Sequence, residues 1–269
     1  MIHSEEDCLS CSLQAMRWWW ILLLVGACAA PKTTVTPLVS PKGGDPLSRI
    51  ASDRVEPWQL IGRSVEGRPI EVRAVGGGPR KVLWVGGIHG TEREGSVATE
   101  ELAQVFLDAG LAKSVTLALV RDLNPDGTTA SSRRNARQVD LNRNFPAKNF
   151  VSSRQTGKKP LDQPEARVLH GLILKFAPDL VIVAHSSSRP YPFINYDGPA
   201  RSLARRFSVL SKYRIVPSAG LHATPGSLGS WVGIDQKIPI LTVEWRRGMD
   251  HTKAWKQTQA AILSIVASG

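Results

Sequence analysis

Four short apolar runs alternate along the chain with longer segments whose apolar residues recur at helical spacing. The runs are rich in Val, Ile and Leu and are typical of buried strands: 81–87, 115–120, 180–184 and 238–243. The longer segments have the pattern of amphipathic helices: 95–109, 164–176, 199–213 and 251–266. Strands that alternate with helices form a mainly parallel sheet covered on both faces, because each parallel connection must cross the sheet. The pattern therefore predicts an α/β fold.

A hairpin is also predicted ahead of the first run, over 58–75, with Glu66 and Gly67 at its turn. It would add antiparallel strands, so we expect a mixed, mainly parallel twisted sheet flanked by helices. The chain has 269 residues, of which 42% are hydrophobic, enough for one full core. Neither an internal repeat nor a second globular domain is apparent. We expect a single domain over 55–269.

The first 28 residues have the organisation of a signal peptide. Arg17 precedes an apolar run at 18–25, which is shorter than the roughly 20 residues that cross a bilayer as a helix. Residues 25–28, Val-Gly-Ala-Cys, are similar to the lipobox of bacterial lipoproteins. That resemblance implies lipidation of Cys28 and cleavage before it. An ordinary signal peptide or a buried strand is the alternative.

The expected start of translation is Met16, because the acidic residues at 5–7 are unlike the beginning of an export signal. Residues 29–54 contain four prolines and suit a flexible tether between membrane and domain. We therefore expect an exported, monomeric lipoprotein that a lipid at Cys28 anchors to a membrane, facing the periplasm or cell wall of a bacterium.

All three cysteines lie in these first 28 residues, at positions 8, 11 and 28. Cys8 and Cys11 form a lone C-x-x-C pair, a weak redox or metal signal, and we do not expect the mature protein to contain them. The rest of the chain has no cysteine. This excludes a disulfide-built fold, cysteine metal ligands and a cysteine nucleophile from residues 29–269.

The net charge of +11 raises the question of a nucleic-acid partner. The basic residues are scattered, with isolated doublets at 133–134, 158–159, 205–206 and 246–247. The sequence has no nucleic-acid-binding motif and no interleaved set of aromatic residues. Anionic wall peptides or anionic lipids account for the charge as well, so we expect no nucleic-acid partner.

Polar residues follow the four apolar runs, at the sheet edge where open α/β sheets bind ligands. After the first run, His89 and Glu92 stand three positions apart in a turn, with Gly90 between them to let the backbone bend sharply. His185 follows the third run and Glu244 the fourth. Two histidines, one glutamate and a water form the zinc site of several hydrolases. Alone, the H-x-x-E spacing also fits a surface turn at a helix N-terminus.

A longer motif separates the two histidines. Its parts are Asn124-Pro125-Asp126-Gly127, Arg133-Arg134-Asn135 and Val139-Asp140-Leu141-Asn142-Arg143-Asn144-Phe145-Pro146. With His89, Glu92, His185 and Glu244, this pattern resembles the zinc carboxypeptidase family, over about four fifths of the chain. The resemblance implies that family's fold, a catalytic domain over 55–269 and one zinc ion per chain.

Three further stretches are similar to one branch of the family, the murein peptide amidases: 163–166, 195–199 and 224–231. These enzymes cleave the bond between the γ-carboxyl of D-glutamate and meso-diaminopimelate in cell-wall peptides. Alternatives within the enzyme class are a carboxypeptidase on ordinary peptide C-termini and an aspartoacylase-like amidohydrolase. An alternative of another class is an inactive lipoprotein that binds peptidoglycan.

The resemblance implies a role for each residue that matches the family motif. His89, Glu92 and His185 would hold the zinc. Glu244 would be the general base that activates the attacking water, and a structural role would be unusual for a carboxylate between Val243 and Trp245.

The resemblance also implies residues that bind the substrate. Arg133 would face the carbonyl oxygen as it gains negative charge, although basic doublets such as 133–134 are more often solvated surface. Asn142 and Arg143 would hold a substrate carboxylate, or else act as turn-capping and structural residues. His222 stands where the pancreatic-type enzymes carry a mobile tyrosine, and we expect it to contact substrate without being the essential acid or base.

Overall fold

The computed structural model describes residue 47, residues 53–218 and residues 224–268. The predictions for the signal peptide at 1–28, for lipidation of Cys28 and for His222 lie outside these residues. Chain contacts divide the protein into Met1–Val39 and Ser40–Gly269, and every described residue belongs to the second unit. In the part of the chain that the structure describes, no helix is long and apolar enough to cross a membrane.

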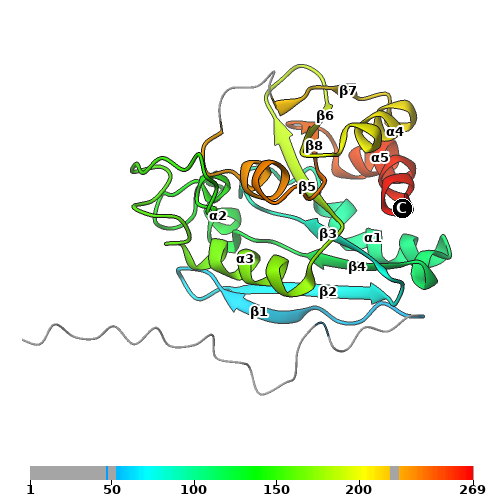
Figure 1. Ribbon diagram of the computed structural model, residues 1–269, viewed down its shortest axis with the longest axis horizontal. Coiled ribbons are helices and arrows are strands. Elements are labelled where there is room, and N and C mark those ends of the chain that lie inside the picture. Colours follow the sequence, from blue (N-terminus) through cyan, green and yellow to red (C-terminus); the bar gives the residue numbers. More distant parts are fainter. Residues whose placement is uncertain (1–46, 48–52, 219–223, 269) are drawn as a thin grey trace, which may run out of the picture. The chain divides into compact units, whose positions relative to one another are not determined.

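The described residues form an eight-stranded sheet in the order β1-β2-β4-β3-β5-β8-β6-β7 (Figure 1). Its strands are β1 (Gln59–Arg63), β2 (Pro69–Gly76), β3 (Arg80–Val85), β4 (Val115–Val120), β5 (Leu180–Ser187), β6 (Phe193–Asp197), β7 (Arg214–Ile215) and β8 (Ile240–Arg246). The central strands β4, β3, β5 and β8 run parallel, whereas β2 and β6 flank them antiparallel. The predicted mixed, mainly parallel sheet is confirmed.

Helices cover both faces of this sheet: α1 (Ser96–Asp108), α2 (Pro125–Thr129), α3 (Pro164–Phe176), α4 (Arg201–Ser211) and α5 (His251–Val266). Short helical turns lie at η1 (Leu111–Lys113), η2 (Leu141–Arg143) and η4 (Gly229–Asp235). The apolar residues of α1, α4 and α5 pack on one face, and those of α3 and η4 pack on the other. The result is a three-layer arrangement (Figure 1).

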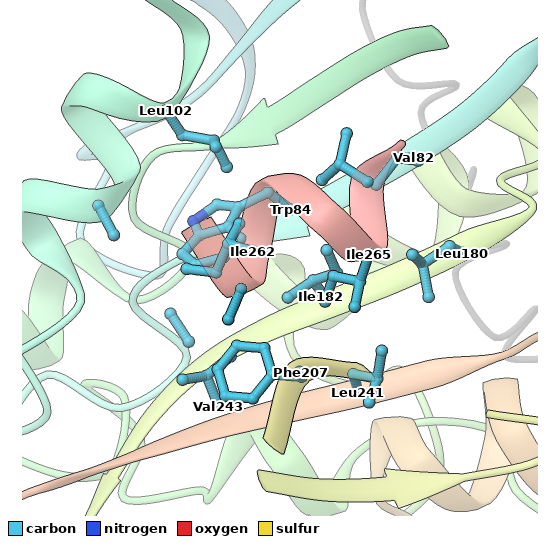
Figure 2. Close-up of a cluster of buried hydrophobic side chains, with 14 of the residues drawn as sticks. Val82, Trp84, Leu102, Leu180, Ile182, Phe207, Leu241, Val243, Ile262 and Ile265 are labelled. Atoms are coloured by element: carbon cyan, nitrogen blue, oxygen red, sulfur yellow. The ribbon is translucent and has the colours of Figure 1, made fainter. Parts of the chain in front are cut away.

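The core under α1, α4 and α5 is built from alternating residues of the parallel strands (Figure 2). Trp84 of β3 and Ile182 of β5 are completely buried there, against Ile262 of α5 and Phe207 of α4. The strands are covered on both faces. The strand residues that alternate with these point to the other face and are buried in the core under α3. This explains why the strands appear in the sequence as continuous apolar runs.

Hydrophobic periodicity placed the central strands, the four long helices and the hairpin of β1 and β2 correctly, with small differences at their ends. It missed β6 and β7, which are short and contain polar residues. It also ended two strands too early, because β5 continues to Ser187 and β8 to Arg246. Backbone pairing does not require apolar side chains, so His185 and Glu244 lie inside paired strands rather than after them.

Gly90 lies in the predicted turn, which the hydrogen bond from the amide of Glu92 to the carbonyl of His89 closes (3.0 Å), and close packing also requires glycine there. Its backbone does not adopt the left-handed conformation that favours glycine. A Cβ at this position would lie 1.9 Å from the backbone carbon of Gly127, in α2. Glycine therefore allows the loop after β3 to pack against the segment after β4, which brings two parts of the sequence motif together.

Candidate functional site

Polar side chains at the carboxyl ends of β3, β5 and β8 line a cavity of about 350 Å³. The lining includes every site residue predicted from the sequence in the described part of the chain: His89, Glu92, Arg133, Asn142, Arg143, His185 and Glu244. They come from five separate segments, which the parallel strand order brings to one edge of the sheet. The other two histidines in the described part of the chain, His170 and His251, do not line the cavity.

Two histidines and one glutamate converge at the bottom of this cavity. His89 and Glu92 lie on the loop after β3, and His185 lies on β5. His185 Nδ1 is 2.7 Å from Glu92 Oε2, and His89 Nδ1 is 3.1 Å from both of these atoms. All three side chains are buried. Ligand atoms of a tetrahedral zinc ion lie about 3.3 Å apart, so this donor set fits zinc in number, type and spacing.

Asp140 supports the cluster from behind. Its Oδ1 atom lies 3.0 Å from His89 Nε2, which leaves Nδ1 of the same ring directed into the cluster. Asp140 also caps η2 by accepting a hydrogen bond from the amide of Asn142 (2.9 Å). Carboxylate–histidine pairs of this kind orient the ring at metal sites. The sequence showed Asp140 within the motif but gave no signal of this role, which depends on contact with a residue 51 positions away.

Replacing Asp140 with Asn is expected to weaken zinc binding about 10–100-fold, the range typical for loss of an outer-shell carboxylate. Asparagine keeps the size of the side chain but removes the charge that holds the His89 ring. The measurement is zinc affinity by chelator competition, with Asp162→Asn as the control, because Asp162 accepts hydrogen bonds from Asn144 and Gln163 away from the cluster. Equal zinc affinities for wild type and Asp140→Asn would contradict this role.

The cluster keeps Glu92 ionised. Burial by itself would raise the pKa of Glu92, but the two histidines beside it lower the pKa well below its usual value. Burial also lowers the pKa of His185. For His89, burial opposes protonation, but the carboxylates of Glu92 and Asp140 outweigh it and raise the pKa. An ionised carboxylate beside two imidazoles is a suitable set of cation ligands.

Glu244 lies on β8 directly beside His185, because the two residues are paired in the parallel register of β5 and β8. Its Oε2 atom is buried and has no hydrogen-bond partner among the described residues. Burial, with the charge of Glu92 nearby, raises the pKa of Glu244 to about 8. A buried carboxylate that faces the cavity without a partner is available to exchange a proton with a bound molecule.

The raised pKa of Glu244 predicts how stability depends on pH in the metal-free protein. Between the ordinary pKa of 4.5 and about 8, folded Glu244 holds a proton that the unfolded chain releases, so the free energy of unfolding falls as pH rises. Glu244→Gln has no such proton. We expect the stability of wild type relative to this variant to fall by about 4 kcal/mol from pH 5 to pH 9. Urea unfolding of both proteins in EDTA measures this, and a constant difference would contradict it.

Arg133 and Arg143 reach the cavity from the motif between the two histidines. Arg133 donates hydrogen bonds to Glu92 Oε1 (2.5 Å) and to Asp140 Oδ2 (3.3 Å), with 44% of its side chain exposed. Arg143 is more deeply placed, and burial lowers its pKa. Asn142 contacts His185 Nε2 at 3.3 Å and accepts a hydrogen bond from the amide of Leu228. The cavity thus holds positive charge above the cluster.

Arg247 also lines the cavity, and sequence reasoning missed it. Its guanidinium group donates to Glu92 Oε1 (3.2 Å) and to the carbonyl of Ser186 (3.3 Å). In the sequence it belongs to the doublet at 246–247, which was interpreted only as part of a scattered basic surface. The available signal for a place in the cavity was its position three residues after Glu244.

Other members of the motif hold the fold instead of facing the cavity. Asn135 donates to Gln163 and Glu165, which join the motif to the start of α3. Asn144 bonds to the carbonyl of Thr156 and to Asp162. These asparagines anchor the loops that carry Arg133 and Arg143.

Comparisons with known proteins agree with this geometry. A model of the family "Zinc carboxypeptidase" matches residues 47–240. Murein peptide amidase A of Escherichia coli (strain K12) is 32% identical over 202 residues, which cover 68% of this chain and 79% of that protein.

Solved structures give the same result. The crystal structure of a murein-tripeptide amidase from Escherichia coli O157 superposes with a TM-score of 0.64 and 25% identity, over 81% of this chain and 95% of that one. Carboxypeptidase A from Helicoverpa armigera shares the fold, with a TM-score of 0.69 and 17% identity, over 80% of this chain and 68% of that one. The family match over most of its length shows that this chain belongs to the zinc carboxypeptidase family and is a hydrolase.

Proposed function

We propose that this protein hydrolyses an amide bond in murein peptides, between the γ-carboxyl of D-glutamate and meso-diaminopimelate. The observation that carries the proposal is the buried cluster of His89, Glu92 and His185 at the bottom of a cavity that also contains Glu244 and three arginines. The similarity to murein peptide amidases supports the choice of substrate. A cavity rich in guanidinium groups suits a peptide that carries several carboxylates.

His89 and His185, each through Nδ1, and Glu92 through its carboxylate would hold one zinc ion. Zinc in such a site brings the pKa of a coordinated water to about 7 and polarises a carbonyl group, so hydrolysis proceeds at neutral pH. Asp140 fixes the ring of His89 for this purpose through the 3.0 Å contact with Nε2.

Glu244 would act as the general base. Its unpartnered Oε2 atom would accept a proton from the attacking water and return it to the leaving amine. The positive charge of a bound metal favours the ionised form of Glu244, which prepares it to accept that proton.

The arginines would bind the negative charges of the substrate. Arg133 would turn from Glu92 towards the carbonyl oxygen, where charge develops in the transition state, and contribute a few kcal/mol. Asn142 and Arg143 would hold the carboxylate of the residue that leaves, Arg143 in a two-pronged contact. His222 would contact the substrate from the segment between Ser218 and Thr224, without being essential for proton transfer.

A hydrolysis assay on defined peptides tests this function. We expect the zinc-loaded protein to cleave L-Ala-γ-D-Glu-meso-diaminopimelate and to lose this activity in chelator. Cleavage only of α-linked C-terminal residues would favour an ordinary carboxypeptidase, and cleavage only of N-acyl amino acids an aspartoacylase-like enzyme. Binding of the peptide without zinc and without turnover would favour an inactive binding lipoprotein.

We propose further that the protein is exported and anchored to a membrane by a lipid on Cys28, which would place it beside its substrate. Support comes from the sequence alone, in the apolar run and the lipobox-like residues that end at Cys28. Labelling with a radioactive fatty acid tests the proposal, with Cys28→Ser as the control that should lose both the label and the membrane fraction.

A further inference from the structure

Arg247 is held in the cavity by a turn that closely fixes its backbone. The amide of Arg247 donates to the carbonyl of Ser187 (2.9 Å), which continues the pairing of β5 and β8. The next amide, that of Gly248, donates to the buried carboxylate of Glu94 (2.7 Å). Gly248 has a φ of 78°, a left-handed conformation that favours glycine. The structure thus positions Arg247 towards the cluster.

The cavity contains three guanidinium groups, one more than the two negative groups of an ordinary peptide substrate. A peptide cleaved before its C-terminal residue presents one carboxylate and one oxygen that becomes negative. Arg143 and Arg133 match these two charges under the proposed function. Arg247 is a third guanidinium in the same cavity, and 43% of its side chain is exposed, so its donors are not all used by Glu92 and Ser186. A third negative group on the substrate would complete the arrangement.

Contacts within the cluster separate Arg247 from Asn142. Asn142 contacts Nε2 of His185, and the opposite ring nitrogen, Nδ1, contacts Oε2 of Glu92. The other oxygen of Glu92, Oε1, contacts Arg247. Asn142 and Arg247 therefore stand at opposite ends of a chain of contacts that passes through two ligand side chains. Arg133 also donates to Glu92 Oε1. If Asn142 holds the carboxylate of the leaving residue and Arg133 faces the carbonyl oxygen, the acyl side is the part of the substrate left for Arg247.

We propose that Arg247 binds a free carboxylate on the acyl residue, and so selects amides formed through a side-chain carboxyl. A residue linked through its own γ-carboxyl keeps an α-carboxylate near the scissile bond, whereas a residue linked in the ordinary way has none there. This inference rests on the proposed function and deepens it, because it assigns the recognition of the γ-linkage to one residue. A charge-assisted hydrogen bond typically gives a tenfold to hundredfold preference.

The experiment pairs one substitution with one chemical change in the substrate. The substrates are L-Ala-γ-D-Glu-meso-diaminopimelate and the same peptide with the α-carboxylate of glutamate converted to an amide. For wild type, kcat/KM is expected to be about 10–100-fold higher for the acid. For Arg247→Gln, we expect kcat/KM for the acid to fall to the value for the amide, so that the preference for the acid is lost. Arg246→Gln, an equal charge change at a neighbour that does not line the cavity, should keep the preference.

Binding gives a second readout that does not depend on turnover. In the Glu244→Gln background, calorimetry should show tighter binding of the acid than of the amide, and Arg247→Gln should remove that difference while zinc content stays at one per chain. Equal losses for both substrates would overturn the inference, because Arg247 would then act on the metal ligand Glu92. An unchanged preference for the acid in Arg247→Gln would also overturn it. If wild type cleaves neither peptide, the proposed function itself fails.

Discussion

Glu244→Gln is expected to lower kcat for the murein tripeptide about 10²–10⁴-fold. The amide of glutamine has nearly the shape of the carboxylate but cannot accept the proton of the attacking water. Glu244 Oε2 is buried and has no hydrogen-bond partner among the described residues, so the substitution breaks no hydrogen bond of this atom there. A loss in kcat with little change in KM would show that the interaction is made in the transition state.

The control for this prediction is zinc content, together with the affinity for the uncleaved peptide. Both should match those of wild type, because Glu244 is not one of the three ligand side chains. A variant that retains more than a tenth of the wild-type kcat would contradict the role of general base. Loss of zinc from the variant would instead show that Glu244 supports the metal site.

His185→Ala is expected to abolish zinc binding at micromolar zinc and, with it, hydrolysis. His185 Nδ1 is the ligand atom nearest to Glu92, at 2.7 Å, so its removal leaves two ligands where zinc takes three from the protein in sites of this type. The effect should exceed the roughly 10–100-fold loss typical for an outer-shell partner. Bound zinc stabilises the folded state by about 4 kcal/mol at a thousand times its dissociation constant, and the variant should lose this gain.

Thermal unfolding with and without zinc, together with metal analysis, measures this prediction. His251→Gln is the matched control. His251 begins α5, contacts Ser96 of α1 (3.1 Å) and does not line the cavity. That variant should keep one zinc per chain and the zinc-dependent rise in melting temperature. Full zinc content in His185→Ala would remove His185 from the proposed ligand set.

Most of the architecture was predictable from the sequence because it depends on local periodicity. Strands buried on both faces leave continuous apolar runs, and helices on a sheet leave an apolar stripe, so β3, β4, β5, β8 and the four long helices were all found. β6 escaped because its five residues include Asn195 and Asp197. Its place beside β8 depends on antiparallel pairing with a strand more than forty residues later, which no local window contains.

Within the motif, the sequence could not separate residues that face the cavity from residues that hold loops. Asn142 and Asn144 are two positions apart and chemically identical, yet Asn142 contacts His185 while Asn144 bonds to Thr156 and Asp162. The division depends on which way each side chain leaves η2. In η2, Asp140 caps the first turn by accepting from the amide of Asn142, and Asn144 lies at the other end.

Local sequence patterns were enough to predict the layers of the fold and the side chains available for chemistry. With no cysteine after Cys28, only histidine and carboxylate side chains remain as the usual ligands for zinc. Which of these side chains meet depends on long-range contacts. The parallel register sets Glu244 beside His185, and the turn after β8, fixed by Glu94, brings Arg247 to Glu92. Strand register and turn geometry join residues more than fifty positions apart, so a cavity of this kind is a property of the folded chain.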